Sequence, residues 1–168
     1  MVRRHHFMVS KQVLEETLGE CIGLERAAQK AVQELDAKGL LPEEMKKKLM
    51  DMHSEANQHE GKLRNILGSV TQSDGIDSDS VEKHAQETVE KTSEMMKTYL
   101  GDQPDELDAL EFLSIAEGGE VIHYEILSKL ATQFKDKKLA KDASSILQEE
   151  KKHLRMCIQL AKTASIKE

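Results

Sequence analysis

The fold of this chain is decided by residues 69–103, SVTQSDGIDSDSVEKHAQETVEKTSEMMKTYLGDQ, which lie between two regions of strong helical periodicity. The first part of this segment, 69–80, is rich in Ser, Asp and Gly and is typical of a loop. From Ser80 onward, apolar residues recur three and four positions apart, which predicts a helix at 80–100. The segment is therefore a long connection that contains a helix of its own.

Four longer helical patterns flank this connection, two on each side. Before it, a serine N-cap favours a helix at 10–38, and Pro42 followed by two glutamates is typical of the start of a second helix at 42–68. After it, apolar residues at helical spacing predict helices at 104–134 and 138–164. Because each pair is joined by a short turn, we expect two antiparallel hairpins.

Two hairpins joined by one long crossover have the connectivity of a ferritin-like bundle, whereas an up-down-up-down bundle needs only a short loop at that point. The composition agrees with an all-α fold, since only 3% of the residues are aromatic, Trp is absent and Pro occurs twice. A length of 168 residues favours one domain. We therefore predict a single domain over 1–168, an all-α ferritin-like four-helix bundle with one long crossover containing a fifth helix.

Charge and cysteine content exclude several classes of function. The chain has 24 Lys and Arg against 31 Asp and Glu, a formal net charge of -7, and has no basic cluster that would bind nucleic acid or an anionic membrane. Cys21 and Cys157 match no metal-binding pair and are expected to be small buried residues in a reducing compartment. With no long apolar segment and no signal-peptide pattern, we expect a cytoplasmic protein.

Charged and imidazole side chains interrupt the apolar stripes of the four long helices. Each stripe places one acid inward, and three of the stripes add a histidine; the residues are Glu25, Glu55, His59, Glu120, His123, Glu150 and His153. A buried carboxylate is too costly to leave unpaired, so four facing acids require a partner such as a cation. Without one they should repel and hold protons. The alternative is that several acids lie at the edge of the stripe and pair with Lys or Arg.

The heights of these acids along the bundle agree. Glu25 and Glu55 are each fifteen residues from the turn near Leu40, roughly 22 Å at about 1.5 Å per residue. Glu120 and Glu150 are likewise each fifteen residues from the turn that joins the last two helices. Both pairs therefore lie at mid-bundle height and could share one site.

Two glutamates on the last two long helices have a histidine three residues later, Glu120 with His123 and Glu150 with His153. Residues three apart lie on one face of a helix, as dinuclear iron or manganese bundles require. Such spacing arises often by chance, so the inference depends on both pairs also facing inward at one height. Tyr124 could donate a hydrogen bond to a ligand or simply pack in the core, and we favour packing.

The sequence also resembles a known family. His123-Tyr124-Glu125-Ile126 is similar to the His-Tyr-Glu-Ile signature of the YciE/YciF-like family of ferritin-like proteins, and looser similarity lies at Glu25, Leu63-Arg64 and Glu149-Glu150. The resemblance implies a four-helix core with a crossover helix, a rubrerythrin-like dinuclear metal centre, a link to bacterial stress responses and a homodimer.

The chain departs from the rubrerythrin and family patterns at two positions. Gln58 stands three residues after Glu55 where the rubrerythrin pattern has a histidine, and Ile122 precedes His123 where the family often has Glu. The first departure, with the histidine one position later at His59, puts the histidine ligand of the second helix in doubt. At the second, Glu120 offers a carboxylate one turn earlier instead.

The expected function is binding of two iron or manganese ions, which oxygen and imidazole ligands suit. Glu55 and Glu120 are the candidate bridging carboxylates, and Glu25 and Glu150 the terminal ones. His153 is a nitrogen ligand, and His59 and His123 compete for the other position. We expect chemistry with dioxygen or peroxide, or iron oxidation. The alternatives are a non-catalytic dimeric stress-induced scaffold or binding protein with a vestigial or empty site, a hemerythrin-like oxygen carrier and a mini-ferritin cage.

Overall fold

The computed structural model describes residues 2–134 and 136–166, with side chains from residue 11 onward. These residues form helices only, with no β-strand among them, so the all-α prediction is confirmed. The helices are α1 Val2–Ala37, α2 Glu43–Asp74, α3 Ser78–Leu100, α4 Glu106–Phe134 and α5 Lys137–Ala164. In the described part of the chain, no helix is long and apolar enough to cross a membrane.

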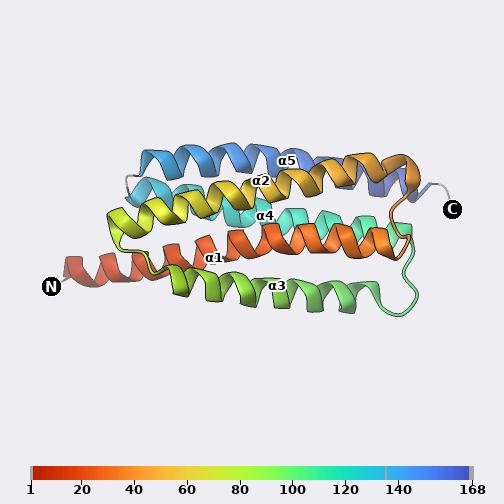
Figure 1. Ribbon diagram of the computed structural model, residues 1–168. Helices are drawn as coiled ribbons and strands as arrows, with labels where there is room; N and C mark the ends of the chain where they lie inside the picture. Colours follow the sequence, from red (N-terminus) through yellow and green to blue (C-terminus); the bar gives the residue numbers. More distant parts are fainter. Residues whose placement is uncertain (1, 135, 167–168) are drawn as a thin grey trace.

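The helices alternate in direction along the chain, and α3 carries the chain back along the full length of the bundle (Figure 1). As a result α2 and α4 run in the same direction, while α1 and α2, and α4 and α5, form antiparallel pairs (Figure 1). Helices α1, α2, α5 and α4 each contact their two neighbours around a common core. Helix α3 packs outside this ring, mainly against α1.

The predicted loop at 69–80 is wrong in extent. Helix α2 continues to Asp74 because Val70, buried at 1%, extends its apolar stripe by another turn. Gly75 then ends the helix with a φ of 62°, a left-handed conformation that glycine adopts without strain. The carboxylate of Asp77 accepts hydrogen bonds from the first N–H groups of α3. Only residues 75–77 therefore separate the two helices.

Helix α1 also begins earlier than predicted, at Val2 and not at Ser10. Serine is a good N-cap, but it is also tolerated inside helices, and no glycine or proline precedes Ser10 to stop the helix.

Two glycines allow α3 to lie close against α1. A Cβ atom at Gly19 would lie 2.5 Å from the carbonyl oxygen of Val81, and one at Gly23 would lie 2.5 Å from that of Ala85. Real side chains cannot come so near a backbone atom. The glycines therefore fix the distance between the crossover helix and the core.

The core has three layers along the bundle axis. Two apolar clusters occupy its ends, the first around Leu18 and Leu63 near the α2–α3 connection, the second around Leu35 and Leu49 near the α1–α2 turn. Between them lies a set of buried polar side chains, which we call the polar layer: Glu25, His59, Glu117, Glu120, Glu150 and His153.

Candidate metal centre

Every helix of the four-helix ring contributes to the polar layer. Helix α1 supplies Glu25, α2 supplies His59, α4 supplies two glutamates, and α5 supplies Glu150 and His153. All six side chains are at most 7% exposed. Because each lies on the apolar stripe of its helix, the packing of the two end clusters turns these groups toward one another.

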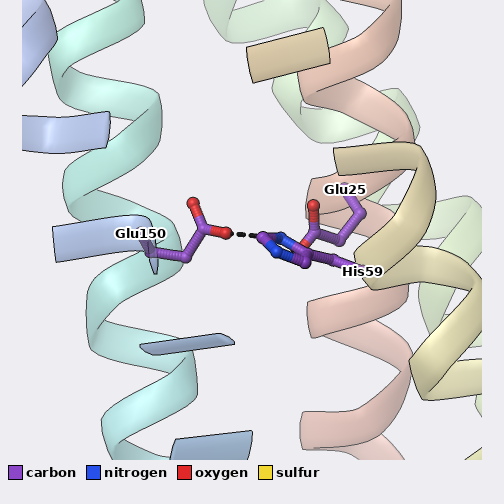
Figure 2. A group of neighbouring side chains, drawn as sticks. All are labelled: Glu25, His59 and Glu150. Carbon is purple, nitrogen blue, oxygen red and sulfur yellow. Dashed lines mark ion pairs between the residues drawn. The ribbon is translucent and has the colours of Figure 1, made fainter. Parts of the chain in front are cut away.

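The first group in the layer joins three helices around the ring of His59 (Figure 2). Its Nδ1 atom lies 2.7 Å from Oε1 of Glu150 and 3.3 Å from Oε1 of Glu25. One ligand atom from each of the three residues lies within 4.8 Å of the other two, which is close enough for all three to hold one metal ion.

The second group shares Glu150 with the first. Nδ1 of His153 lies 3.1 Å from Oε2 of Glu150 and 3.6 Å from Oε2 of Glu117, and these three residues also meet within 4.8 Å. The two oxygens of Glu150 therefore face different histidines, Oε1 facing His59 and Oε2 facing His153. The two imidazole rings are stacked with their centroids 6.2 Å apart. Glu150 is thus placed between two groups of potential ligands.

Tyr124 and Glu120 support the layer from α4. The hydroxyl of Tyr124 donates to Oε1 of Glu25, and both side chains are fully buried. Our preference for simple packing of Tyr124 was therefore incomplete, because the ring packs in the first apolar cluster and its hydroxyl also holds a carboxylate. The carboxyl groups of Glu120 and Glu150 lie beside each other.

Several polar atoms of the layer have no hydrogen-bond partner. Among the described residues, six buried side-chain atoms lack one, and four of them belong to this layer: Glu25 Oε2, His59 Nδ1, Glu117 Oε2 and Glu150 Oε1. His59 Nδ1 is near Glu150 Oε1 but is not aligned with it for a hydrogen bond. Unsatisfied buried polar atoms are costly. Oxygen and imidazole atoms left free at one point are a donor set that fits a bound cation.

Three of the buried carboxyl groups favour their protonated form. Burial, together with neighbouring carboxylates, raises the pKa of Glu117 and of Glu120 well above the usual range. Burial also raises the pKa of Glu25 to about 7, although His59 and Tyr124 oppose the shift. These raised pKa values agree with the expectation that neighbouring buried carboxyl groups retain their protons.

Glu150 behaves in the opposite way, which corrects that expectation. Burial disfavours its charge, but the hydrogen bond with His153 and the close contact with the imidazole of His59 outweigh burial and hold the pKa of Glu150 well below its usual range. Burial likewise opposes charge on His59, but contacts with Glu150 and Glu25 raise its pKa to about 10. The metal-free layer is therefore organised around an ionised Glu150 between two histidines.

Glu55 was expected to face inward, but its side chain is 49% exposed. The position three residues before His59 on the inner face of α2 is taken by Ala56, which is buried. Glu55 lies beside that face, and its Oε2 accepts a hydrogen bond from Nε2 of His153. Its predicted inward orientation is therefore wrong, because its carboxylate reaches His153 from the exposed side of α2.

His123 also lies away from the cluster. Its side chain is 28% exposed, its Nδ1 donates to the carbonyl oxygen of Gly119 at 2.7 Å, and its Nε2 is 3.4 Å from Glu20. The next residue, Tyr124, takes the inward position. The expected inward orientation of His123 is thus wrong, and His59 is the histidine that the structure brings to the centre.

Sequence reasoning missed Glu117. The predicted stripe of α4 passed from Leu113 through Ala116 to Glu120, whereas the structure buries both Glu117 and Glu120. Glu117 lies four residues after Leu113 and three before Glu120, which is as compatible with the inner face of a helix as the position of Ala116. Periodicity therefore allowed a buried Glu117 but could not distinguish it from its neighbour.

Comparisons of the chain with protein-family models, curated proteins and solved structures found no match. The class of protein is therefore defined by its fold and its site alone. The chain is an all-helical bundle whose buried glutamates and histidines could hold a metal ion.

Proposed function

We propose that the chain is a ferritin-like protein that binds two iron or manganese ions in the polar layer. The observation that carries this proposal is the position of Glu150, whose two oxygens face two separate groups of ligands. One ion would be held by Glu25, His59 and Glu150, and the other by Glu117, Glu150 and His153. Glu150 would then be the bridging carboxylate, with Glu120 as a further oxygen ligand.

The chemistry of the donors supports iron or manganese. Carboxylate and imidazole ligands suit these metals, and a structural zinc site would be expected to use thiolates. Burial raises the pKa of both Cys21 and Cys157, so neither thiol is poised to ionise. A pair of such ions supplies redox chemistry toward dioxygen or peroxide, or iron oxidation. The protein's own contribution is to hold the ligands and to exclude water, and the hydroxyl of Tyr124 holds one carboxylate oxygen of Glu25.

The ferritin-like assignment is supported by the parallel course of α2 and α4 and by the crossover helix between them (Figure 1). The resemblance to the YciE/YciF-like family, its link to bacterial stress and the cytoplasmic location form part of the same proposal. The family resemblance and the stress link rest on the sequence signature around His123, whereas the cytoplasmic location rests on the cysteine content, which favours a reducing compartment.

Metal analysis of protein purified without a chelator tests the proposal. We expect two ions per chain, or two after incubation with Fe(II) or Mn(II) in the absence of oxygen. Glu150→Ala should reduce the metal content sharply, because both ions lose a ligand. Glu87→Gln, which alters an exposed glutamate beside His84 on α3, is the matched control and should retain both ions. Wild-type protein that is metal-free and does not take up either metal would contradict the proposal.

A second candidate is a non-catalytic dimeric scaffold with an empty site, and an exposed apolar face favours it. Ile115, Ile122 and Ile126 lie on one side of α4 and are exposed. A protein that melts at the same temperature with and without a chelator, and whose dimer is lost in Ile122→Asp, would favour this candidate.

A further inference from the structure

Each buried histidine of the polar layer forms a hydrogen bond with a partly exposed glutamate through Nε2, the ring nitrogen that faces away from the layer. Nε2 of His59 donates to Oε2 of Glu149 at 2.5 Å, and Nε2 of His153 donates to Oε2 of Glu55. The histidines are buried, whereas the side chains of Glu149 and Glu55 are 34% and 49% exposed. Both pairs therefore connect the surface of the bundle to its centre.

The two pairs are arranged reciprocally across the boundary between α2 and α5. Glu149 of α5 binds the histidine of α2, and Glu55 of α2 binds the histidine of α5. Lys62 lies 3.8 Å from Oε2 of Glu149 and limits where that carboxylate can move. The same two helices thus hold both rings from outside.

The inner nitrogen of each ring faces the buried carboxylates. Nδ1 of His59 lies 2.7 Å from Glu150, and Nδ1 of His153 lies 3.1 Å from the same residue. A neutral imidazole has one N–H group and one free lone pair. When a carboxylate accepts a hydrogen bond from Nε2–H, the lone pair must be on Nδ1, which here points into the layer.

We propose that Glu149 and Glu55 are positioning residues that hold His59 and His153 with Nδ1 directed at the bound metal ions. This inference rests on the proposed function, and it gives Glu55 a role other than that of a ligand. Carboxylates that bind the outer nitrogen of a metal-bound histidine fix its orientation and its tautomer, and their loss typically weakens metal binding by about 10- to 100-fold.

A rival explanation is that the two glutamates only attract cations by their charge. Substitution with Gln and with Asp separates the two explanations. Glu149→Gln removes the charge at constant length, whereas Glu149→Asp keeps the charge but withdraws the carboxylate from His59. The amide oxygen of the Gln variant can still accept from Nε2–H, so positioning predicts that the Asp variant loses more affinity than the Gln variant. Simple attraction predicts the reverse, with wild-type affinity in the Asp variant and weaker binding in the Gln variant. The same pair of substitutions applies to Glu55.

The experiment is a titration of wild type and variants with Mn(II), in which electron paramagnetic resonance measures the free ion. We expect about 10- to 100-fold weaker binding of one ion in Glu149→Asp and in Glu55→Asp, a smaller loss in the two Gln variants, and unchanged binding in Glu87→Gln. Circular dichroism should show folded protein throughout, because the altered side chains are partly exposed. Asp variants with wild-type affinity would overturn the inference.

Nitrogen-15 NMR of the imidazole rings in Zn(II)-loaded protein gives a second measurement. If Glu149 and Glu55 only stabilised the fold, their substitution would not change the nitrogen chemical shifts of the two histidines. Zn(II) is diamagnetic and binds such donors more tightly than Mn(II) or Fe(II). In wild type, Nε2 of both histidines should carry the proton and Nδ1 should show the metal-bound shift. Wild-type protein that binds no metal overturns both proposals, whereas metal binding that is unchanged in the four variants overturns only the positioning role.

Discussion

The two ends of the bundle and its middle are built on different principles. The end clusters consist mainly of buried aliphatic side chains such as Leu18 and Leu49, which have no polar atoms to satisfy. The polar layer between them contains four buried atoms without a hydrogen-bond partner. The ends therefore stabilise the fold by burial alone, while the layer lowers stability unless protons or a cation compensate its charges. The proposed binding of metal ions would compensate the charges of the layer.

The largest expected difference between the regions is their response to pH. The pKa of Glu25 is raised from 4.5 to about 7, so its contribution to stability is present below pH 4.5 and is lost as the pH rises through 7. The pKa of His59 is raised from 6.5 to about 10, so its contribution is lost as the pH rises toward 10. The aliphatic ends do not titrate.

Metal-free protein should therefore lose on the order of 3 kcal/mol of unfolding free energy between pH 5 and pH 8. Metal-loaded protein should lose less, because bound cations replace the protons of the layer. Urea unfolding at several pH values, with EDTA and with Mn(II), measures both curves. Identical curves would show that the layer holds no cation.

Leu63→Ala tests the first apolar cluster. The side chain is fully buried, so its truncation leaves a cavity and should cost about 2–5 kcal/mol of unfolding free energy. Because the layer lies in a different part of the core, the folded variant should still bind two metal ions. Chemical unfolding and metal analysis of the same sample test both statements, and a loss of metal at full folding would show that the two regions are not separate.

Glu150→Gln tests the centre of the layer. In the metal-free protein this substitution removes the ionised partner of two histidines and should cost about 3 kcal/mol. In the metal-loaded protein it also removes the shared ligand, so stabilisation by Mn(II) should disappear. Thermal melting with and without Mn(II) measures both effects. If the variant is as stable as wild type without metal, Glu150 is not the ionised centre of the layer.

Gly23→Ala tests the close packing of α3 against α1, outside the polar layer. The new methyl group would collide with the backbone of α3 and should cost about 1–3 kcal/mol. Gly61→Ala is the control, since nothing lies within 4 Å of its Cβ position, and it should stabilise α2 by about 0.5–1 kcal/mol. Unfolding curves of the two variants should therefore shift in opposite directions.

Glu120→Gln should have the smallest effect on the metal-free protein. Because burial raises the pKa of Glu120 and so favours its neutral form, an amide of similar shape should change the unfolding free energy by less than about 1 kcal/mol. Metal affinity should fall if Glu120 provides an oxygen ligand. A loss of metal-free stability as large as that of Glu150→Gln would show that Glu120 is ionised.

Several features of the site could be predicted from the sequence because they depend on helical periodicity. Glu25, His59, Glu150 and His153 fall on the apolar stripes of their helices, and the structure buries all four. Their common height follows from the constant rise per residue and from the positions of the turns. No tertiary information was needed for either conclusion.

The loop at 69–80 shows a limit of local signals. Ser, Asp and Gly residues favour turns, but Val70 packs in the core and carries α2 onward to Asp74. Turn residues alone could not indicate how much apolar surface the neighbouring helices would offer.

The sequence by itself determined that the chain forms helices, where most of them end and which of them carry inward acids, because periodicity and helix-terminating residues act locally. Only the tertiary structure decided between neighbouring positions: Ala56 over Glu55, Tyr124 over His123, and Glu117 together with Glu120. Adjacent residues differ by about 100° around a helix, and the rotation of each helix about its axis is fixed only by packing against the others. For the same reason, the position of Glu150 between two histidines emerges only when α2 and α5 are side by side.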